Sequence, residues 1–345
     1  MIPTSGCFDE MMRHMTKAPE LSVLEICAGA GGQSSGLEMA GFSHSLAVEI
    51  DRDAAATLRL NRPGWDVQEG DVREVNGRDY KGVDLLAGGV PCPPFSIAGK
   101  QLGADDERDL FPEAIRLVRE ARPTAVMLEN VKGLASARFS PYRQSILDAL
   151  DAMGYDADWQ LFNSSEFGVA QLRPRFILVA MKRRNFRKFE WPRAHGTPPT
   201  VGRVLGPLMG SRGWEGAAEW ATRANNIAPT LVGGSKKHGG ADLGPTRAKQ
   251  AWLQLGVDGR GVAEEAPGAD APLHHVPRLT NEMAARIQGF SEDWKFSGRK
   301  TSVYRQIGNA FPPPVAKAIG GSIGEALGAV VSRSTSTGAK LRAVS

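Results

Sequence analysis

The chain has 345 residues, a formal net charge of +4 and three cysteines, Cys7, Cys27 and Cys92, which lie far apart. An odd number of widely spaced cysteines argues against a disulfide framework and favours a reducing compartment. Residues 1–20 lack the apolar core of a signal peptide, and no apolar stretch is long enough to span a bilayer. We therefore expect a cytoplasmic protein with one large domain and a smaller one, and neither a secreted nor a membrane protein.

Apolar, strand-like segments alternate with segments of helical pattern through the first half of the chain. This alternation predicts an α/β fold with a mostly parallel sheet that helices cover on both faces. In such sheets, ligands bind beyond the carboxyl ends of the strands. We expect strands at residues 21–27, 45–50, 83–87, 125–128 and 176–180, an acidic turn at residues 69–71, and helices at residues 33–40, 53–60, 111–120 and 140–153.

The composition changes after Pro192, where Gly, Ala, Pro and basic residues become frequent and the periodicity weakens. Regular patterning returns at Leu279, with Thr280 as the N-cap of a helix over residues 282–287, and a last helix is expected over residues 315–327. The Ser/Thr-rich end of the chain is expected to be disordered. The predicted organisation is an N-terminal extension (1–20), a main domain in two parts (21–190 and 277–330), an inserted domain (191–276) and a tail (331–345).

A glycine-rich loop follows the first expected strand. Gly29, Gly31 and Gly32 let the backbone approach a ligand closely. Glu49 ends the next strand, where a carboxylate can accept both hydroxyls of a ribose, and Asp71 ends the third unit, where it can accept an adenine amino group. A dinucleotide is less favoured, because Ser34 stands where its fingerprint needs a third glycine. The loop therefore predicts an adenosine-bearing cofactor.

Cys92 lies in a stiff loop after the third expected strand, preceded by Pro91 and followed by two more prolines. Prolines fix φ and remove backbone donors, so the thiol is placed for access. A lone cysteine is more often a buried packing residue, and that alternative stands on this motif alone.

Eight segments in order resemble motifs of the bacterial C5-cytosine DNA methyltransferases of restriction-modification type. They cover residues 21–180 and 277–320. The matching segments are Leu24 to Gly32, Glu49, Asp71, Pro91-Cys92, Glu129-Asn130-Val131, Gln171-Leu172-Arg173-Pro174-Arg175, Arg278-Leu279-Thr280 with Arg286 to Phe290, and Gln306-Ile307-Gly308-Asn309-Ala310.

The resemblance implies a Rossmann-like methyltransferase sheet with a smaller target-recognition domain, which corresponds to the inserted segment. It implies S-adenosylmethionine as the cofactor and no metal. The cofactor-binding residues implied are Ala28, Gly29, Ala30, Gly31, Gly32, Glu49, Ile50, Asp71, Val72, Pro91, Asn309 and Ala310. The catalytic residues implied are Cys92, Glu129, Arg173 and Arg175, and the DNA-binding residues are Ser96, Arg203, Lys236, Lys237 and Arg247.

The implied reaction explains these residue types. A Cys92 thiolate adds to C6 of a flipped cytosine, which makes C5 nucleophilic enough to take the methyl group. Glu129 stabilises charge on the ring through N3, while Arg173 and Arg175 hold the base O2 and a flanking phosphate. Asn130 braces the loop around Pro91 rather than touching the base. Two residues depart from the family: Pro93 replaces the usual Gln, and Cys27 replaces a common Phe and is expected to pack inside its strand.

The partner implied is double-stranded DNA, with a cognate restriction endonuclease encoded nearby but not bound. The enzyme is expected to be a monomer in the bacterial cytoplasm, associated with the nucleoid. Two alternatives are a tRNA cytosine-5 methyltransferase on the same fold and a catalytically silent DNA-binding regulator. The long inserted segment disfavours the first, and intact Cys92, Glu129, Arg173 and Asn309 disfavour the second. The basic runs at residues 182–188 and 236–249 suit phosphate contacts, but solvated loops would look the same.

Overall fold

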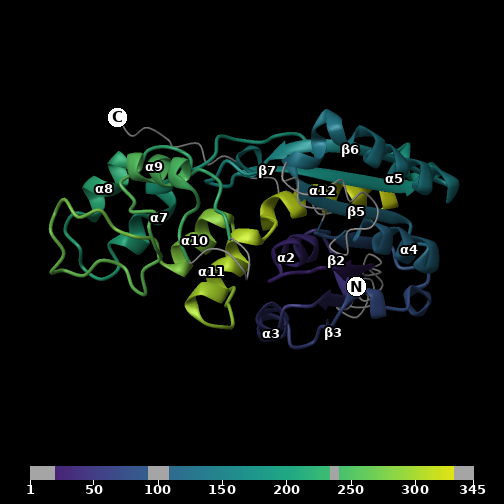
Figure 1. Ribbon diagram of the computed structural model, residues 1–345, viewed down its shortest axis with the longest axis horizontal. Helices are drawn as coiled ribbons and strands as arrows, with labels where there is room; N and C mark the ends of the chain where they lie inside the picture. The colour runs from purple at the N-terminus through teal and green to yellow at the C-terminus, as the bar shows by residue number, and fades with distance from the viewer. Residues whose placement is uncertain (1–19, 92–108, 234–240, 330–345) are drawn as a thin grey trace, which may run out of the picture.

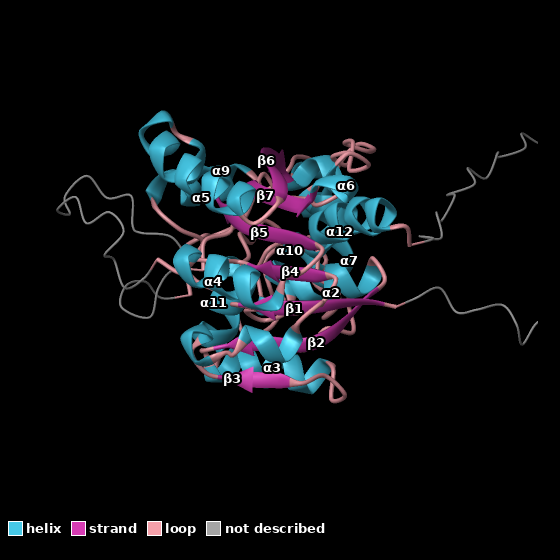
Figure 2. Cartoon of the chain, turned by 90° about the vertical axis from the view of Figure 1, so that its right-hand side faces the viewer, coloured by secondary structure: helices cyan, strands magenta, loops and turns pink. Residues whose placement is uncertain are grey.

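The computed structural model describes residues 20–91, 109–233 and 241–329. At its centre is a seven-stranded sheet (Figure 1), and Figure 2 shows its strands from bottom to top in the order β3-β2-β1-β4-β5-β7-β6. The first five strands pair in parallel, and β7 runs antiparallel to both β5 and β6. The strands are β1 (Leu21–Ile26), β2 (Phe42–Glu49), β3 (Val67–Glu69), β4 (Leu85–Gly88), β5 (Ala125–Val131), β6 (Tyr155–Asn163) and β7 (Pro174–Lys182).

Helices cover both faces of the sheet (Figure 2). Successive side chains of a strand point to opposite faces, so Leu24 and Ile26 pack with one set of helices while Val23 packs with the other. The first face is covered by α4 (Phe111–Ala121) and α5 (Ser140–Ala152), and the second by α2 (Gly32–Met39) and α12 (Pro313–Leu327). The two apolar layers confirm the expected α/β fold and explain why the central strands read as continuous apolar runs.

The described residues of the 191–276 segment form three helices, α7 (Val201–Met209), α8 (Ala217–Arg223) and α9 (Thr246–Gln254). They gather around the fully buried indoles of Trp220 and Trp252. Two later helices, α10 (Asn281–Gln288) and α11 (Lys300–Asn309), contribute to the same apolar cluster and lie between this lobe and the sheet (Figure 1). The division of the chain at residue 276 stays a prediction, and apolar packing continues across it.

Local signals set several boundaries. Thr280 caps α10 as expected, because its hydroxyl accepts from the Met283 amide at 3.2 Å. Asp51 caps α3 (Arg52–Asn61) in the same way, through the Asp53 and Ala54 amides. The remaining elements are α6 (Arg183–Phe186) and the 3₁₀ turns Val72–Glu74, Gly77–Tyr80, Lys132–Ala135, Ala137–Phe139 and Ser164–Phe167.

The structure differs from the expectations in several elements, and helices α6 to α9 are among those not expected. Residues 67–69 form strand β3 next to the expected acidic turn, and β6 and α11 were not expected at all. The last expected strand, β7, is antiparallel, because the chain reaches it through the edge strand β6.

Among the described residues, no helix combines the length and the apolar character needed to cross a membrane.

Candidate active site

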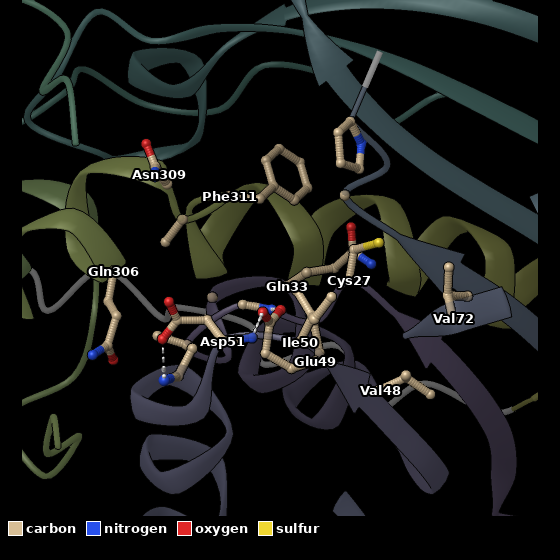
Figure 3. A pocket seen from close by; sticks show the side chains of 18 of the residues that line it. Cys27, Gln33, Val48, Glu49, Ile50, Asp51, Val72, Gln306, Asn309 and Phe311 are labelled. Atoms are coloured by element: carbon tan, nitrogen blue, oxygen red, sulfur yellow. Dashed lines mark hydrogen bonds between the residues drawn. The ribbon is translucent and has the colours of Figure 1, made fainter. Parts of the chain in front are cut away.

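A cavity of about 690 Å³ opens at the carboxyl ends of the parallel strands (Figure 3). The segments after β1, β2, β3 and β4 form one side, Glu129 of β5 contributes at one end, and residues 305–311 close the opposite wall. All but one of the predicted cofactor residues line it: Ala28, Gly29, Ala30, Gly32, Glu49, Ile50, Asp71, Val72, Pro91, Asn309 and Ala310. The topology therefore brings together residues that are up to 282 positions apart, from Ala28 to Ala310.

The glycine loop lets the backbone of residues 305–311, which form the opposite wall of the cavity, lie close to it. A Cβ on Gly32 would lie 2.3 Å from the carbonyl oxygen of Phe311, so no other residue fits without moving that backbone. Gly31 is the exception to the cofactor prediction. It has φ 86°, does not line the cavity, and faces the Trp294 ring, which a Cβ would approach to 2.4 Å. Trp294 Nε1 donates to the Ala30 carbonyl at 3.0 Å. Because Gly31 has no side chain, the Trp294 ring can pack against the loop and make this bond.

Glu49 connects the glycine loop to the end of β2. Its Oε2 accepts from the Gly29 amide at 2.7 Å, and its Oε1 accepts from the Asp51 amide at 2.7 Å. The residue is buried, and this desolvation raises the pKa of Glu49 above its ordinary value. A carboxylate has about four lone-pair sites, more than the backbone amides of Gly29, Asp51 and Ile50 occupy, and the Glu49 side chain lines the cavity.

Asp71 and Val72 follow β3, the neighbour of β2 in the sheet, and Ile50 directly follows Glu49; all three line the cavity. Asp71 accepts from the amide and guanidinium of Arg73, both at 2.9 Å, which holds the carboxylate in place. Ile50 is 69% exposed although it is a large apolar side chain. Exposed apolar surface inside a cavity suits contact with a flat, weakly polar ring.

Cys92 lies outside the described residues, and Pro91, the last described residue before it, lines the cavity. Glu129 faces this strand end, because a Cβ on Gly89 would lie 3.3 Å from Glu129 Oε2. The Arg175 Nε atom lies 2.5 Å from Glu129 Oε1 as an ion pair, although its N–H is not aligned for a hydrogen bond. Asn130 Nδ2 donates to the Val90 carbonyl at 2.8 Å, which confirms the expected bracing of the loop.

Arg173 takes a different position from Arg175. It is fully buried, and its Nη1 and Nη2 donate to the carbonyls of Leu231 and Gly308, each at 2.8 Å. Desolvation lowers the pKa of Arg173 well below its usual range. These two bonds give Arg173 a bracing role, and its Nε has no partner among the described residues. Its predicted contact with the base or a phosphate stays a prediction, whereas Arg175 is the arginine that pairs with Glu129.

The similarity of the chain to known proteins agrees with this geometry. The model of the C-5 cytosine-specific DNA methylase family matches residues 21–325. The chain belongs to this family. It is 61% identical to the Type II methyltransferase M.NaeI of Lentzea aerocolonigenes over 89% of this chain and 75% of the relative. It is 52% identical to M.NgoMIV of Neisseria gonorrhoeae over 89% of this chain and 98% of that one.

A solved structure shares the fold as well. It is a prophage-encoded protein of Escherichia coli assigned as a DNA modification methyltransferase, with 25% identity and a TM-score of 0.63 over 89% of this chain and 99% of the other. The present chain is therefore an S-adenosylmethionine-dependent DNA (cytosine-5) methyltransferase, as its sequence predicted. The tRNA methyltransferase and the silent regulator are not favoured.

The methyltransferase residues predicted to bind DNA divide into two groups. Arg203 on α7 and Arg247 on α9 are exposed side chains of the 191–276 segment. Ser96, Lys236 and Lys237 lie outside the described residues.

Two residues that line the methyltransferase cavity show where the sequence prediction failed: one was placed wrongly and the other was not predicted. Cys27 was expected inside a strand, but it follows β1 with φ 51° and lines the cavity. Burial raises the pKa of the Cys27 thiol, which disfavours the reactive thiolate. Gln33 was missed; its only signal in the sequence is its place directly after the glycine loop, where a helix begins.

Proposed function

We propose that S-adenosylmethionine lies along the carboxyl edge of the sheet with its adenosine at β2 and β3. Glu49 would accept the ribose hydroxyls, Asp71 the adenine amino group, and Ile50 would pack against the adenine ring. The cavity volume, the Glu49 carboxylate in the cavity wall and the exposed Ile50 support this placement. When bound, the cofactor supplies an electrophilic methyl group on sulfur.

We further propose that Cys92 is the nucleophile. Its thiolate forms a bond to C6 of the target cytosine, and the displaced electron pair makes C5 the nucleophile that takes the methyl group. Loss of the C5 proton then returns an electron pair that expels Cys92 from C6. Glu129, held opposite Gly89 and paired with Arg175, would bind the N3 edge of the ring while charge develops there.

DNA recognition is assigned to the 191–276 segment. A base inside a duplex cannot present C6 to a thiol, so the target must flip out, at a cost of a few kcal/mol. Arg203 and Arg247 are exposed donors on this segment and suit phosphates or guanine edges. By analogy with relatives named Type II methyltransferases, we propose that the chain, acting as a monomer at the nucleoid, protects host DNA from a cognate endonuclease encoded nearby.

The observation that carries the chemistry is the convergence of Pro91, Glu129 and the glycine loop on one cavity. A duplex with 5-fluorocytosine at the target should give a denaturation-stable complex in the presence of S-adenosylmethionine, because the fluorine cannot leave as a proton does. Cys7→Ala is the matched control and should keep the complex, since Cys7 lies outside the matched family region. A complex that survives Cys92→Ala would refute the assignment.

Protection of host DNA has a separate test. Bisulfite sequencing of DNA from a host that expresses the chain should show methylated cytosines within one short sequence. The endonuclease that cuts this sequence should fail to cut the modified DNA. Methylation scattered over unrelated sequences would contradict the restriction-modification role.

A further inference from the structure

Gln33 is a buried side chain whose amide has no partner. The residue is only 4% exposed, and neither Nε2 nor Oε1 makes a hydrogen bond in the described structure. Most buried polar atoms are paired, because an amide removed from water without a new hydrogen bond is costly. Gln33 also lines the cavity of the candidate active site (Figure 3). Unpaired polar atoms in the wall of a binding cavity point to a ligand that pairs them.

The position of Gln33 identifies the part of the ligand. Along the sheet edge, β3 and β2 carry Asp71 and Glu49, and β4 and β5 carry Pro91 and Glu129. Gln33 lies between these two ends, in the first turn of α2 that follows β1. If adenosine lies at β2 and β3 and the methyl group faces the base at β4 and β5, the third substituent of sulfur must leave near α2. That substituent is the α-amino-acid chain of the cofactor.

The chemistry of an amide matches this group. The cofactor's α-carboxylate needs donors, its α-ammonium needs acceptors, and Gln33 offers Nε2 for the first and Oε1 for the second. The N-terminus of α2 adds a partial positive charge that favours the carboxylate. We propose that Gln33 is a positioning residue that binds the α-amino-acid end of S-adenosylmethionine. This inference rests on the proposed placement of the cofactor in the cavity.

The test compares two ligands that differ only at this end. S-adenosylhomocysteine carries the α-amino acid, and 5′-methylthioadenosine has the same adenosine and thioether without it. In titration calorimetry, Gln33→Met should raise the dissociation constant of S-adenosylhomocysteine about tenfold or more and leave that of methylthioadenosine unchanged. Met has nearly the volume of Gln and no polar atom to bury. The ligand-free variant should therefore melt at the same temperature as the wild type or higher, whereas loss of a structural hydrogen bond would lower it.

Two further variants keep the outcomes distinct. Gln33→Glu should weaken S-adenosylhomocysteine more than Gln33→Met does, since a carboxylate repels the ligand's carboxylate, and should again spare methylthioadenosine. An unchanged constant for S-adenosylhomocysteine in Gln33→Met, or equal weakening of both ligands, would overturn the role of Gln33. Glu49→Ala should weaken both ligands. If it weakens neither, the cofactor placement itself fails, whatever Gln33 does.

Discussion

Replacing Glu49 with alanine should have two separable effects. In the protein alone, the Gly29 and Asp51 amides lose a carboxylate acceptor at 2.7 Å. Each such bond contributes about 1.5–3 kcal/mol, and relief from burying the charge offsets part of the loss, so we expect a net destabilisation of about 1–3 kcal/mol. For the cofactor, the variant loses the proposed bonds to the ribose hydroxyls. This loss should cost about 1.5–3 kcal/mol, or roughly a 10- to 150-fold rise in dissociation constant.

Calorimetric titration with S-adenosylhomocysteine measures the second effect, and urea unfolding without ligand measures the first. Glu69→Ala is the matched control, because Glu69 is the register partner of Glu49 on the neighbouring strand. Glu69 is exposed, does not line the cavity, and pairs with Arg59 on the surface. Its loss should cost at most about 1 kcal/mol in stability and leave ligand affinity unchanged.

One result would refute the reasoning. If Glu49→Ala loses stability as expected but binds S-adenosylhomocysteine like the wild type, Glu49 only braces the glycine loop. Equal loss of affinity in Glu69→Ala would instead indicate a general effect of charge at this sheet edge.

Three other changes have defined outcomes. Gly32→Ala should destabilise the protein by about 1–3 kcal/mol and weaken S-adenosylhomocysteine, because its Cβ would lie 2.3 Å from the Phe311 carbonyl; an unchanged melting temperature would contradict this. Arg173→Met should lower the free energy of unfolding by about 2–4 kcal/mol in urea titrations, since two buried carbonyls lose their donors; wild-type stability would exclude the bracing role. Asp258 accepts from Arg260 and Arg278, and these bonds hold the pKa of Asp258 well below its usual range. Asp258→Asn should therefore cost about 1 kcal/mol at neutral pH. A carboxyl group whose pKa is lowered in the folded state stabilises the protein fully above its unfolded-state pKa near 4 and loses this contribution as the pH falls. The difference in stability between wild type and Asp258→Asn should therefore persist at pH 5 and shrink below about pH 4; a difference that grows in acid would contradict this.

The sequence predicted what local chemistry controls. Apolar runs placed most strands within a few residues of their bounds, and the Thr280 cap did the same for α10. The glycine loop, Glu49 and Asp71 predicted the cavity wall, because loops after parallel strands share one edge of a sheet. The long apolar signal of β7 gave its position but not its direction, which depends on the connection through β6.

Other features depend on tertiary contacts that no local pattern carries. β6 is an edge strand in which only Tyr155 and Phe162 are buried, so it lacks the apolar run that marks a central strand. Arg173 and Arg175 have the same chemistry two positions apart, and only the fold places one inside and the other beside Glu129. The unpaired amide of Gln33 can be recognised only once burial and hydrogen-bond partners are known together.

The 191–276 segment is joined to the strand-end residues around Arg173 by hydrogen bonds that do not depend on polar side chains at positions 228 and 231 of the segment. Gln171 Oε1 accepts from the Leu231 amide, Arg173 donates to the Leu231 carbonyl, and the Leu172 amide donates to the Ala228 carbonyl. On the side of the 191–276 segment, every group in these bonds is main chain. These bonds at positions 228 and 231 need a main-chain amide and carbonyl but no polar side chain. Both side chains are fully buried and must stay apolar, and Thr230 between them adds a hydroxyl that donates to the Leu172 carbonyl. If the 191–276 segment reads the DNA bases, as proposed, a segment with other base-reading side chains could replace it, provided that its backbone follows the same path through positions 228 and 231 and keeps apolar residues there.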